Sequence, residues 1–326
     1  MSQSAKRGLR ANFAALAKLR ACPPFAPSTN SLLTVILLVV LATPLSAQTR
    51  YASGQDVVPV YEGWERNPDG SFNFVFGYMN RNYEEQMDIP VGPNNKIEPG
   101  PVDQGQPAHF YRRRQQFVFK VKVQKDWGDK DLVWTLTSAG HTEKAFASLR
   151  PFDEIGNLVY QENRGGPGDL TYPEEPNEAP SIEMVGSANR TIKVGDPLAL
   201  TVGVTDDGHP KPRPRKAATT PPPAAIRDSD GAIVATGPDR SGGPQRENPL
   251  TQAVVKLDPG VTLGVTWIVY RASPGEVTFD PMHVKVVDGK ASTKVKFSKA
   301  GTYRLRAYAD DGVLVTPLDV TVTVEE

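Results

Sequence analysis

The sequence predicts an all-β protein with two antiparallel β-sandwich domains behind an N-terminal signal segment. From about residue 50 onward, apolar and polar residues alternate and helical periodicity is absent. Turn-forming residues interrupt this alternation at short intervals, and the chain ends in two alternating segments on either side of Asp311-Gly312. Half-apolar strands of this kind bury their apolar faces by packing sheet on sheet.

Residues 1–47 have the character of a secretory signal peptide. A basic leader without acidic residues precedes an apolar run at 32–42, and Pro44 and a small-residue site ending at Ala47 follow it. The run has about ten residues, whereas a spanning helix needs about 20. We therefore expect cleavage after Ala47 and a secreted, periplasmic or envelope location, typical of bacteria. An uncleaved anchor at about 32–47 is the alternative, and only in that case would the protein keep a membrane span.

Cysteine and charge narrow the chemistry of the mature chain. The only cysteine of the full sequence, Cys22, lies in the leader ahead of the apolar run, and this position disfavours a lipid anchor. The mature chain would therefore have no cysteine, and so no disulfide, cysteine nucleophile or thiolate metal site. Removing the leader takes away five basic residues and no acidic one, so 32 Lys and Arg face 37 Asp and Glu. This balance argues against nucleic-acid binding.

The first domain is expected at 48–160. Val57–Glu65 and Ser71–Arg81 read as strands around the turn Asn67–Gly70, and Arg81–Gln106 reads as a long irregular passage, functional or mobile. Further strands are expected at Phe117–Val123, Leu132–Leu136 and Ala145–Leu149. The second predicted strand carries four aromatics at spacing two, which indicates a core face: Phe72, Phe74, Phe76 and Tyr78.

A linker is expected at 161–180 because Gly, Pro and Glu dominate it, and a second domain at 181–326. Alternating apolar residues at 198–204 and Trp267 in a later strand match strands B and C of the immunoglobulin fold. Tyr303, just after Gly301, stands where a tyrosine corner would lie. This half therefore resembles the immunoglobulin-like modules, especially the polycystic-kidney-disease-type and cadherin-like domains, of bacterial exported proteins.

The second domain departs from that family at about 206–250. Pro at every second position near 210–214 and again at 221–223 favours polyproline II over sheet, so we expect an exposed, disordered insertion. It is either a binding arm or an ornament, since lengthening an exposed loop costs little entropy.

No catalytic motif stands in its expected context. The four histidines, His109, His141, His209 and His283, are scattered without metal-ligand spacing, and no nucleophile elbow or phosphate-binding loop is present. We therefore expect no enzyme, no catalytic residue and no cofactor other than calcium. A secreted hydrolase, or an accessory protein to one, is an alternative, because paired carboxylates across a cleft cannot be recognised from sequence.

Four aspartates form a candidate calcium site. In an immunoglobulin-like sandwich the B–C and F–G loops lie at one end, which brings Asp206 and Asp207 toward Asp310 and Asp311. Carboxylate oxygens are the ligands that Ca²⁺ prefers. The competing interpretation is that Asp-Asp-Gly serves twice as turn chemistry.

Three aromatic residues in or near turns, Trp64, Tyr83 and Trp127, are candidates for stacking on a sugar. Arg112-Arg113-Arg114 is either a contact for an anionic surface, such as lipopolysaccharide or a carboxylated glycan, or a solvated edge. Together these features predict a non-catalytic exported protein with a structural or interaction role in the envelope, whose partner is a protein or a glycan. A carbohydrate-binding module is the alternative.

Overall fold

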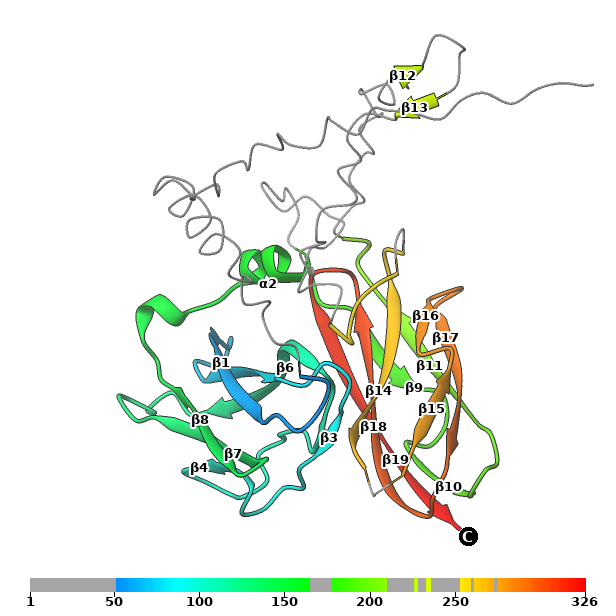
Figure 1. Cartoon of the computed structure of the whole chain (residues 1–326). Coiled ribbons are helices and arrows are strands. Elements are labelled where there is room, and N and C mark those ends of the chain that lie inside the picture. Colours follow the sequence, from blue (N-terminus) through cyan, green and yellow to red (C-terminus); the bar gives the residue numbers. More distant parts are fainter. Residues whose placement is uncertain are drawn as a thin grey trace, which may run out of the picture. The chain divides into compact units, whose positions relative to one another are not determined.

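The structure, a computed structural model, describes residues 51–164, 177–209, 253–258, 261–272 and 275–326, and two short strands at 226–227 and 233–235. The predicted signal segment at 1–47 lies outside these residues, as does most of the linker and of the Pro-rich insertion. Residues Arg50–Glu326 form one compact unit. The predicted fold class is confirmed, because antiparallel sheets make up nearly all of its regular structure (Figure 1).

The first sandwich consists of two three-stranded sheets and a small strand pair. One sheet has the order β1-β2-β6, formed by Val57–Arg66, Phe72–Asn80 and Arg113–Val123. The other has the order β4-β7-β8, formed by Asn95–Glu98, Leu132–Ser138 and His141–Ala147. The pair is β3 with β5, Met87–Asp88 and His109–Phe110.

Aromatic side chains fill the first core, as predicted. Phe74 and Phe76 are fully buried and Tyr78 is 2% exposed, while Phe72 is partly buried against the same core. Phe76 stacks on Phe119 at 5.3 Å between ring centroids and meets the edge of Trp134 on the opposite sheet at 5.8 Å. Burying each ring stabilises the fold by about 2 kcal/mol.

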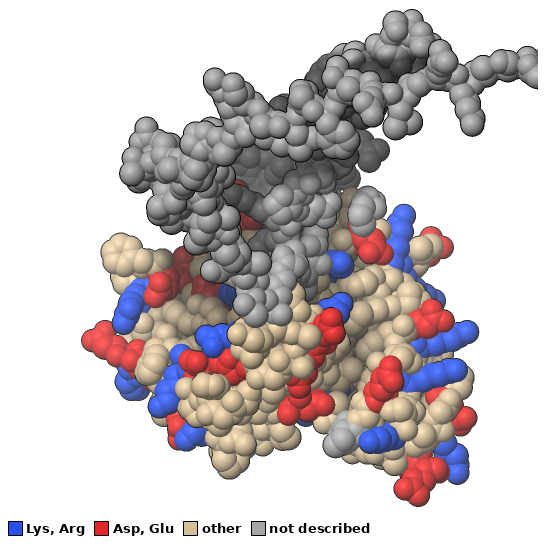
Figure 2. All heavy atoms as spheres, in the orientation of Figure 1, with Lys and Arg blue, Asp and Glu red and all other residues tan. Residues whose placement is uncertain are grey.

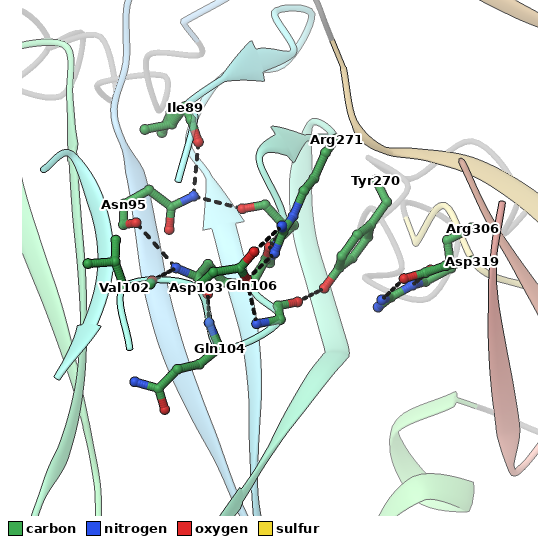
Figure 3. Close-up of polar contacts among 12 residues, drawn as sticks. Ile89, Asn95, Val102, Asp103, Gln104, Gln106, Tyr270, Arg271, Arg306 and Asp319 are labelled. Carbon is green, nitrogen blue, oxygen red and sulfur yellow. Dashed lines mark hydrogen bonds and ion pairs between the residues drawn. The ribbon is translucent and has the colours of Figure 1, made fainter. Parts of the chain in front are cut away.

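The passage expected to be irregular contains β3 and β4 and is held by side-chain amides. Asn95 donates through Nδ2 to the carbonyls of Ile89 and Pro107, at 2.9 and 2.7 Å. Gln106 donates to the carbonyl of Val102 at 2.7 Å, and both Asn95 and Gln106 are fully buried (Figure 3). Because buried carbonyls need donors, these amides take the place of a sheet ladder.

The second sandwich has a five-stranded and a four-stranded sheet. The first has the order β10-β19-β18-β14-β16, formed by Asn189–Lys193, Val315–Glu325, Gly301–Asp310, Gly264–Arg271 and His283–Lys285. The second has the order β15-β17-β11-β9, formed by Val277–Asp280, Lys290–Phe297, Leu198–Thr205 and Ser181–Met184. Only β10 and β19 pair in parallel within these two sheets. The orders match the two sheets of an immunoglobulin-like sandwich.

Two predicted markers of that fold are confirmed. Trp267 on β14 is fully buried in the second core. Tyr303 on β18 is also fully buried, and its hydroxyl donates to the carbonyl of Lys299, four residues upstream, at 2.9 Å. This bond is the geometry of a tyrosine corner.

A short helix differs from the prediction that helix is absent. After the 3-10 turn η1 (Pro151–Asp153), α2 spans Asn157–Arg164. Its Tyr160 is 4% exposed and packs on Phe117 at 4.5 Å between ring centroids. Because an eight-residue helix has little intrinsic stability, this burial holds it in place.

Within the predicted insertion, the structure describes β12 (Ile226–Arg227) and β13 (Ile233–Ala235), which pair with each other in antiparallel fashion. The domain limits 48–160, 161–180 and 181–326 remain our proposal.

Candidate functional site

The outward face of β14 is apolar because the first sandwich covers it. Val265, Trp267 and Val269 point into the second core, while Ile268 and Tyr270 form a separate buried cluster with Tyr308 of β18. Tyr111 and Val118 of the first sandwich pack against this cluster. Seven consecutive residues of β14 are therefore buried instead of every second one.

Tyrosine hydroxyls bind main-chain groups across this interface. Tyr308 donates to the carbonyl of Val118 at 2.9 Å, and the Tyr111 hydroxyl accepts the N–H of Val269 at 2.9 Å. Tyr270 donates to the carbonyl of Gly105, and its own carbonyl accepts the N–H of Ala108 at 3.0 Å. Burial raises the pKa of Tyr111 and of Tyr270 above the ordinary value, so these two phenols act as neutral donors and acceptors.

Arg271 adds a charged contact at the end of β14. Its guanidinium donates two hydrogen bonds to the Asp103 carboxylate and two to the carbonyl of Gln106 (Figure 3). Hydrogen bonds from Arg271 hold the pKa of Asp103 at about 2, below its usual range. The loop around Asp103 is therefore an interface segment of the first sandwich.

The turn after β18 makes a second contact between the sandwiches. The Asp311 carboxylate accepts the N–H groups of Val313 and Leu314, each at 2.7 Å, and the Nδ2 of Asn177 at 3.0 Å. The turn places Val313, fully buried, in a cluster with Val75, Phe117 and Tyr160. Burial raises the pKa of the Asp311 carboxyl to about 6.

Hydrogen bonds to residues 177 and 178 connect the two turns that carry the four predicted calcium ligands. The Asp311 carboxylate accepts the Nδ2 of Asn177. Asp207 Oδ2 accepts the main-chain N–H of Glu178, the residue after Asn177, at 2.8 Å. Asp206 and Asp310 accept N–H groups of the glycines two residues on, Gly208 and Gly312. All four thus serve as turn acceptors, which is the chemistry of the competing interpretation.

Across the described residues, no group of three or more His, Cys, Asp or Glu side chains has the geometry to hold a metal ion. Calcium at Asp206, Asp207, Asp310 and Asp311 stays a prediction. A rise in melting temperature with added Ca²⁺, reversed by a chelator, would support it, and an unchanged melting temperature would remove it.

The predicted sugar-stacking residues have three different environments. Trp64 is 4% exposed, donates to the carbonyl of Arg150 at 2.8 Å and belongs to the core, so its ring offers no free face. Trp127 is half-buried against Phe74. Tyr83 is half-buried under the Arg113 guanidinium, whose Cζ lies 3.8 Å from the ring centroid. Tyr83 also lines a groove.

That groove, of about 740 Å³, has walls from both sandwiches. Tyr83, Arg112 and Arg113 belong to the first wall, and Lys256, Phe279 and His283 to the second. Its volume lies in the range of small-ligand sites. Two side chains predicted separately, Tyr83 and Arg112, therefore meet at one place, and this groove is the candidate binding site.

The three arginines of the predicted basic run have separate roles. Arg114 pairs with the buried carboxylate of Glu62 at 2.7 Å, so Arg114 is not part of a solvated edge. Arg113 donates to the carbonyl of Arg81 at 3.1 Å, while its Nε is buried without a hydrogen-bond partner. Arg112 is exposed, and its guanidinium pairs with no residue that the structure describes.

Comparison with solved structures finds similarity to β-sandwich domains of surface and extracellular proteins. Domains 4 and 5 of the S-layer protein SbsC match with a TM-score of 0.24 and 7% identity over 61% of this chain and 66% of that one. The D00-D0 domain of intimin gives 0.23 and 8%, covering 82% and 100%. The fibronectin(III)-like modules of Clostridium thermocellum CbhA give 0.21 and 10%, covering 83% and 94%.

Similarity at this level assigns no function. The chain spans 66%, 31% and 28% of the three S-layer structures that head the comparison. No protein-family model matches the sequence, and no curated protein matches it. The narrower resemblance to polycystic-kidney-disease-type and cadherin-like domains therefore stays a proposal.

Sequence reasoning missed the interface itself. A signal for it is present in β14, where Ile268 and Tyr270 are apolar at the positions that alternate with the core residues. A strand that is apolar on both faces is buried on both faces. The groove has no comparable signal, because its two walls come from strands and loops that lie far apart in the sequence.

Proposed function

We propose that the chain is a non-catalytic exported protein whose two β-sandwiches act as one rigid unit in a structural or interaction role at the cell envelope. The observation that carries this proposal is the interface. It combines the buried cluster of Ile268, Tyr270 and Tyr308 with the bidentate Arg271–Asp103 pair. Contacts between domains that hinge on each other are smaller and more polar.

The proposal of export rests on the signal-like segment at 1–47, which lies outside the described residues. None of the helices in the described ranges is long and apolar enough to cross a membrane. The expected export supports an envelope protein or a glycan as the partner, and the expected acidic balance of the mature chain argues against a nucleic acid.

Two measurements test the proposal. Fractionation of cells expressing the full chain with a C-terminal tag should place it outside the cytoplasm, shortened by about the length of the leader. Small-angle scattering or NMR relaxation should show the sandwiches tumbling together. A full-length cytoplasmic product would refute export, and independent tumbling of the two sandwiches would refute the rigid unit.

A glycan-binding role is the second candidate, and the groove favours it. Tyr83 and Phe279 lie among its lining residues with Arg112 and Arg113, which gives both apolar and charged contacts. Titration with neutral and acidic oligosaccharides tests this role.

A further inference from the structure

The groove holds an excess of positive charge. Arg112, Arg113 and Lys256 line it, whereas Glu276 is the one acidic residue among its described lining residues. Figure 2 shows Lys and Arg mixed with Asp and Glu over the visible described surface, so there the surface charge is not separated into one-sign areas. Among the described residues that line the groove, basic side chains outnumber acidic ones.

Five arginines outside the groove form ion pairs, whereas the two groove arginines, like Arg150, Arg190 and Arg304, form none with a residue that the structure describes. Arg66, Arg81, Arg114, Arg271 and Arg306 each pair with an Asp or Glu. Arg112 and Arg113 pair with no carboxylate that the structure describes. Since a guanidinium binds a carboxylate through two parallel bonds, these two arginines are suited to an acid supplied by a ligand.

Arg113 is held in an unusual backbone conformation. Its φ of 61° lies in the left-handed region, where a residue with a Cβ is strained. The side chain lies over the ring of Tyr83, and its buried Nε has no hydrogen-bond partner among the described residues. Strain and a missing partner at one residue are features of binding sites.

The rest of the groove is apolar or neutral. Val254, Val277, Phe279 and Met282 supply apolar surface, and Gln86 and His283 supply neutral polar groups. Burial lowers the pKa of His283, so its imidazole is neutral at pH 7. A ligand that fits therefore carries few negative charges together with hydroxyls and C–H faces. A sugar acid has this composition, whereas a strongly acidic peptide would need more cations.

We propose that the groove between the sandwiches binds an acidic oligosaccharide, with the carboxylate of a uronic acid paired to Arg112 and Arg113. This inference deepens the proposed glycan role and rests on the rigid two-sandwich unit, because each sandwich supplies one wall. The ring of Tyr83 stacks against the Arg113 guanidinium and holds it in position.

Calorimetric titration of the purified full-length protein with an α-1,4-linked galacturonic acid trimer, at low salt, tests the proposal. The trimer should bind at least tenfold more tightly than the matching neutral galactose trimer, and added salt should weaken it. Arg112→Ala should weaken binding at least tenfold. Arg112 is exposed and pairs with none of the described residues, so its loss should leave the fold of the two sandwiches intact. Lys294→Ala, which removes an exposed cation from β17 of the second sandwich, should leave binding unchanged.

The proposal is overturned if the acidic trimer does not bind, if the neutral trimer binds equally well, or if Arg112→Ala has no effect. Binding of an acidic hexapeptide in place of the trimer would also overturn it. Scattering on the same sample separates the two proposals. If the protein is rigid but does not bind the trimer, only the proposed ligand is refuted. If the two sandwiches move independently, both the rigid unit and the binding groove are refuted.

Discussion

Asp103 and Arg271 connect the two sandwiches through a pair of hydrogen bonds, each 2.7 Å long, between one carboxylate and one guanidinium. Asp103 lies in the passage between β4 and β5, and Arg271 is the last residue of β14. The same guanidinium also binds the carbonyl of Gln106, a fully buried residue. The pair therefore fixes a loop of one sandwich to a strand end of the other.

Arg271→Ala should lower the free energy of unfolding by about 1–2 kcal/mol, because it removes charge-assisted bonds and leaves the Gln106 carbonyl without its donor. Asp103 is half exposed, which limits the effect. Urea denaturation measures the change. Lys294→Ala, which removes an exposed cation from β17, should stay within about 0.5 kcal/mol of the wild type. Equal effects of both variants would contradict the interface.

Gly77 should tolerate no side chain. A Cβ there would lie 2.1 Å from Glu62 Oε1 and 2.4 Å from the Gln115 carbonyl oxygen. Gly77→Ala should therefore destabilise the protein by about 2–4 kcal/mol, since it displaces the buried Glu62–Arg114 pair. Thermal and urea unfolding measure the loss. The control is Gly156→Ala, where a Cβ meets nothing within 4 Å. Comparable stability of the two variants would show that the close contacts are absent.

The hydroxyl of Tyr303 should contribute about 1 kcal/mol through its bond to the Lys299 carbonyl. Tyr303→Phe keeps the buried ring and removes only this bond. Unfolding in urea should show a lower midpoint with an unchanged slope. A variant as stable as the wild type would argue that the corner is not formed in solution.

Asp311 should make stability depend on pH. Its carboxyl has a pKa of about 6 in the folded protein and about 3.9 when unfolded, so the folded state binds more protons between these values. The group therefore favours folding fully below about pH 4, and this contribution is lost as the pH rises through 6. The loss is of the order of 1–3 kcal/mol.

Asp311→Asn removes that titration but keeps an oxygen acceptor for the N–H groups of Val313 and Leu314. The difference in free energy of unfolding between the variant and the wild type should change between pH 4 and 7 in favour of the variant. Chemical denaturation at a series of pH values measures it. A difference that is constant with pH would contradict the raised pKa.

Strands in which apolar and polar residues alternate could be predicted from sequence, because this alternation reflects one buried face and one solvent-exposed face. The strand predicted around 198–204 and the closing hairpin are examples, and both lie within a few residues of their predicted positions. Helix α2 could not be predicted, since eight residues carry little periodicity and its position depends on burial of Tyr160.

The loop that holds Asn95 and Gln106 was misjudged for a different reason. Amide side chains are commonest at turns and surfaces, whereas here they satisfy buried carbonyls. The candidate site was predicted only in pieces. Tyr83 was predicted as a candidate for sugar stacking, and Arg112 as part of either an anionic-surface contact or a solvated edge. No local pattern could show that the wall carrying Phe279 and His283 lies opposite them.

The tyrosine hydroxyls of Tyr111, Tyr270 and Tyr308 meet main-chain atoms at Val269, Gly105 and Val118. Every amino acid presents a carbonyl, and all but proline an N–H, so these bonds place almost no demand on the identity of the opposing residue. The bond from Tyr308 therefore survives exchange of Val118 for another apolar residue. Homologues should retain the three phenols while position 118 varies, whereas Gly105, at a φ of 94°, and Val269, in the second core, are constrained by their own conformation and packing.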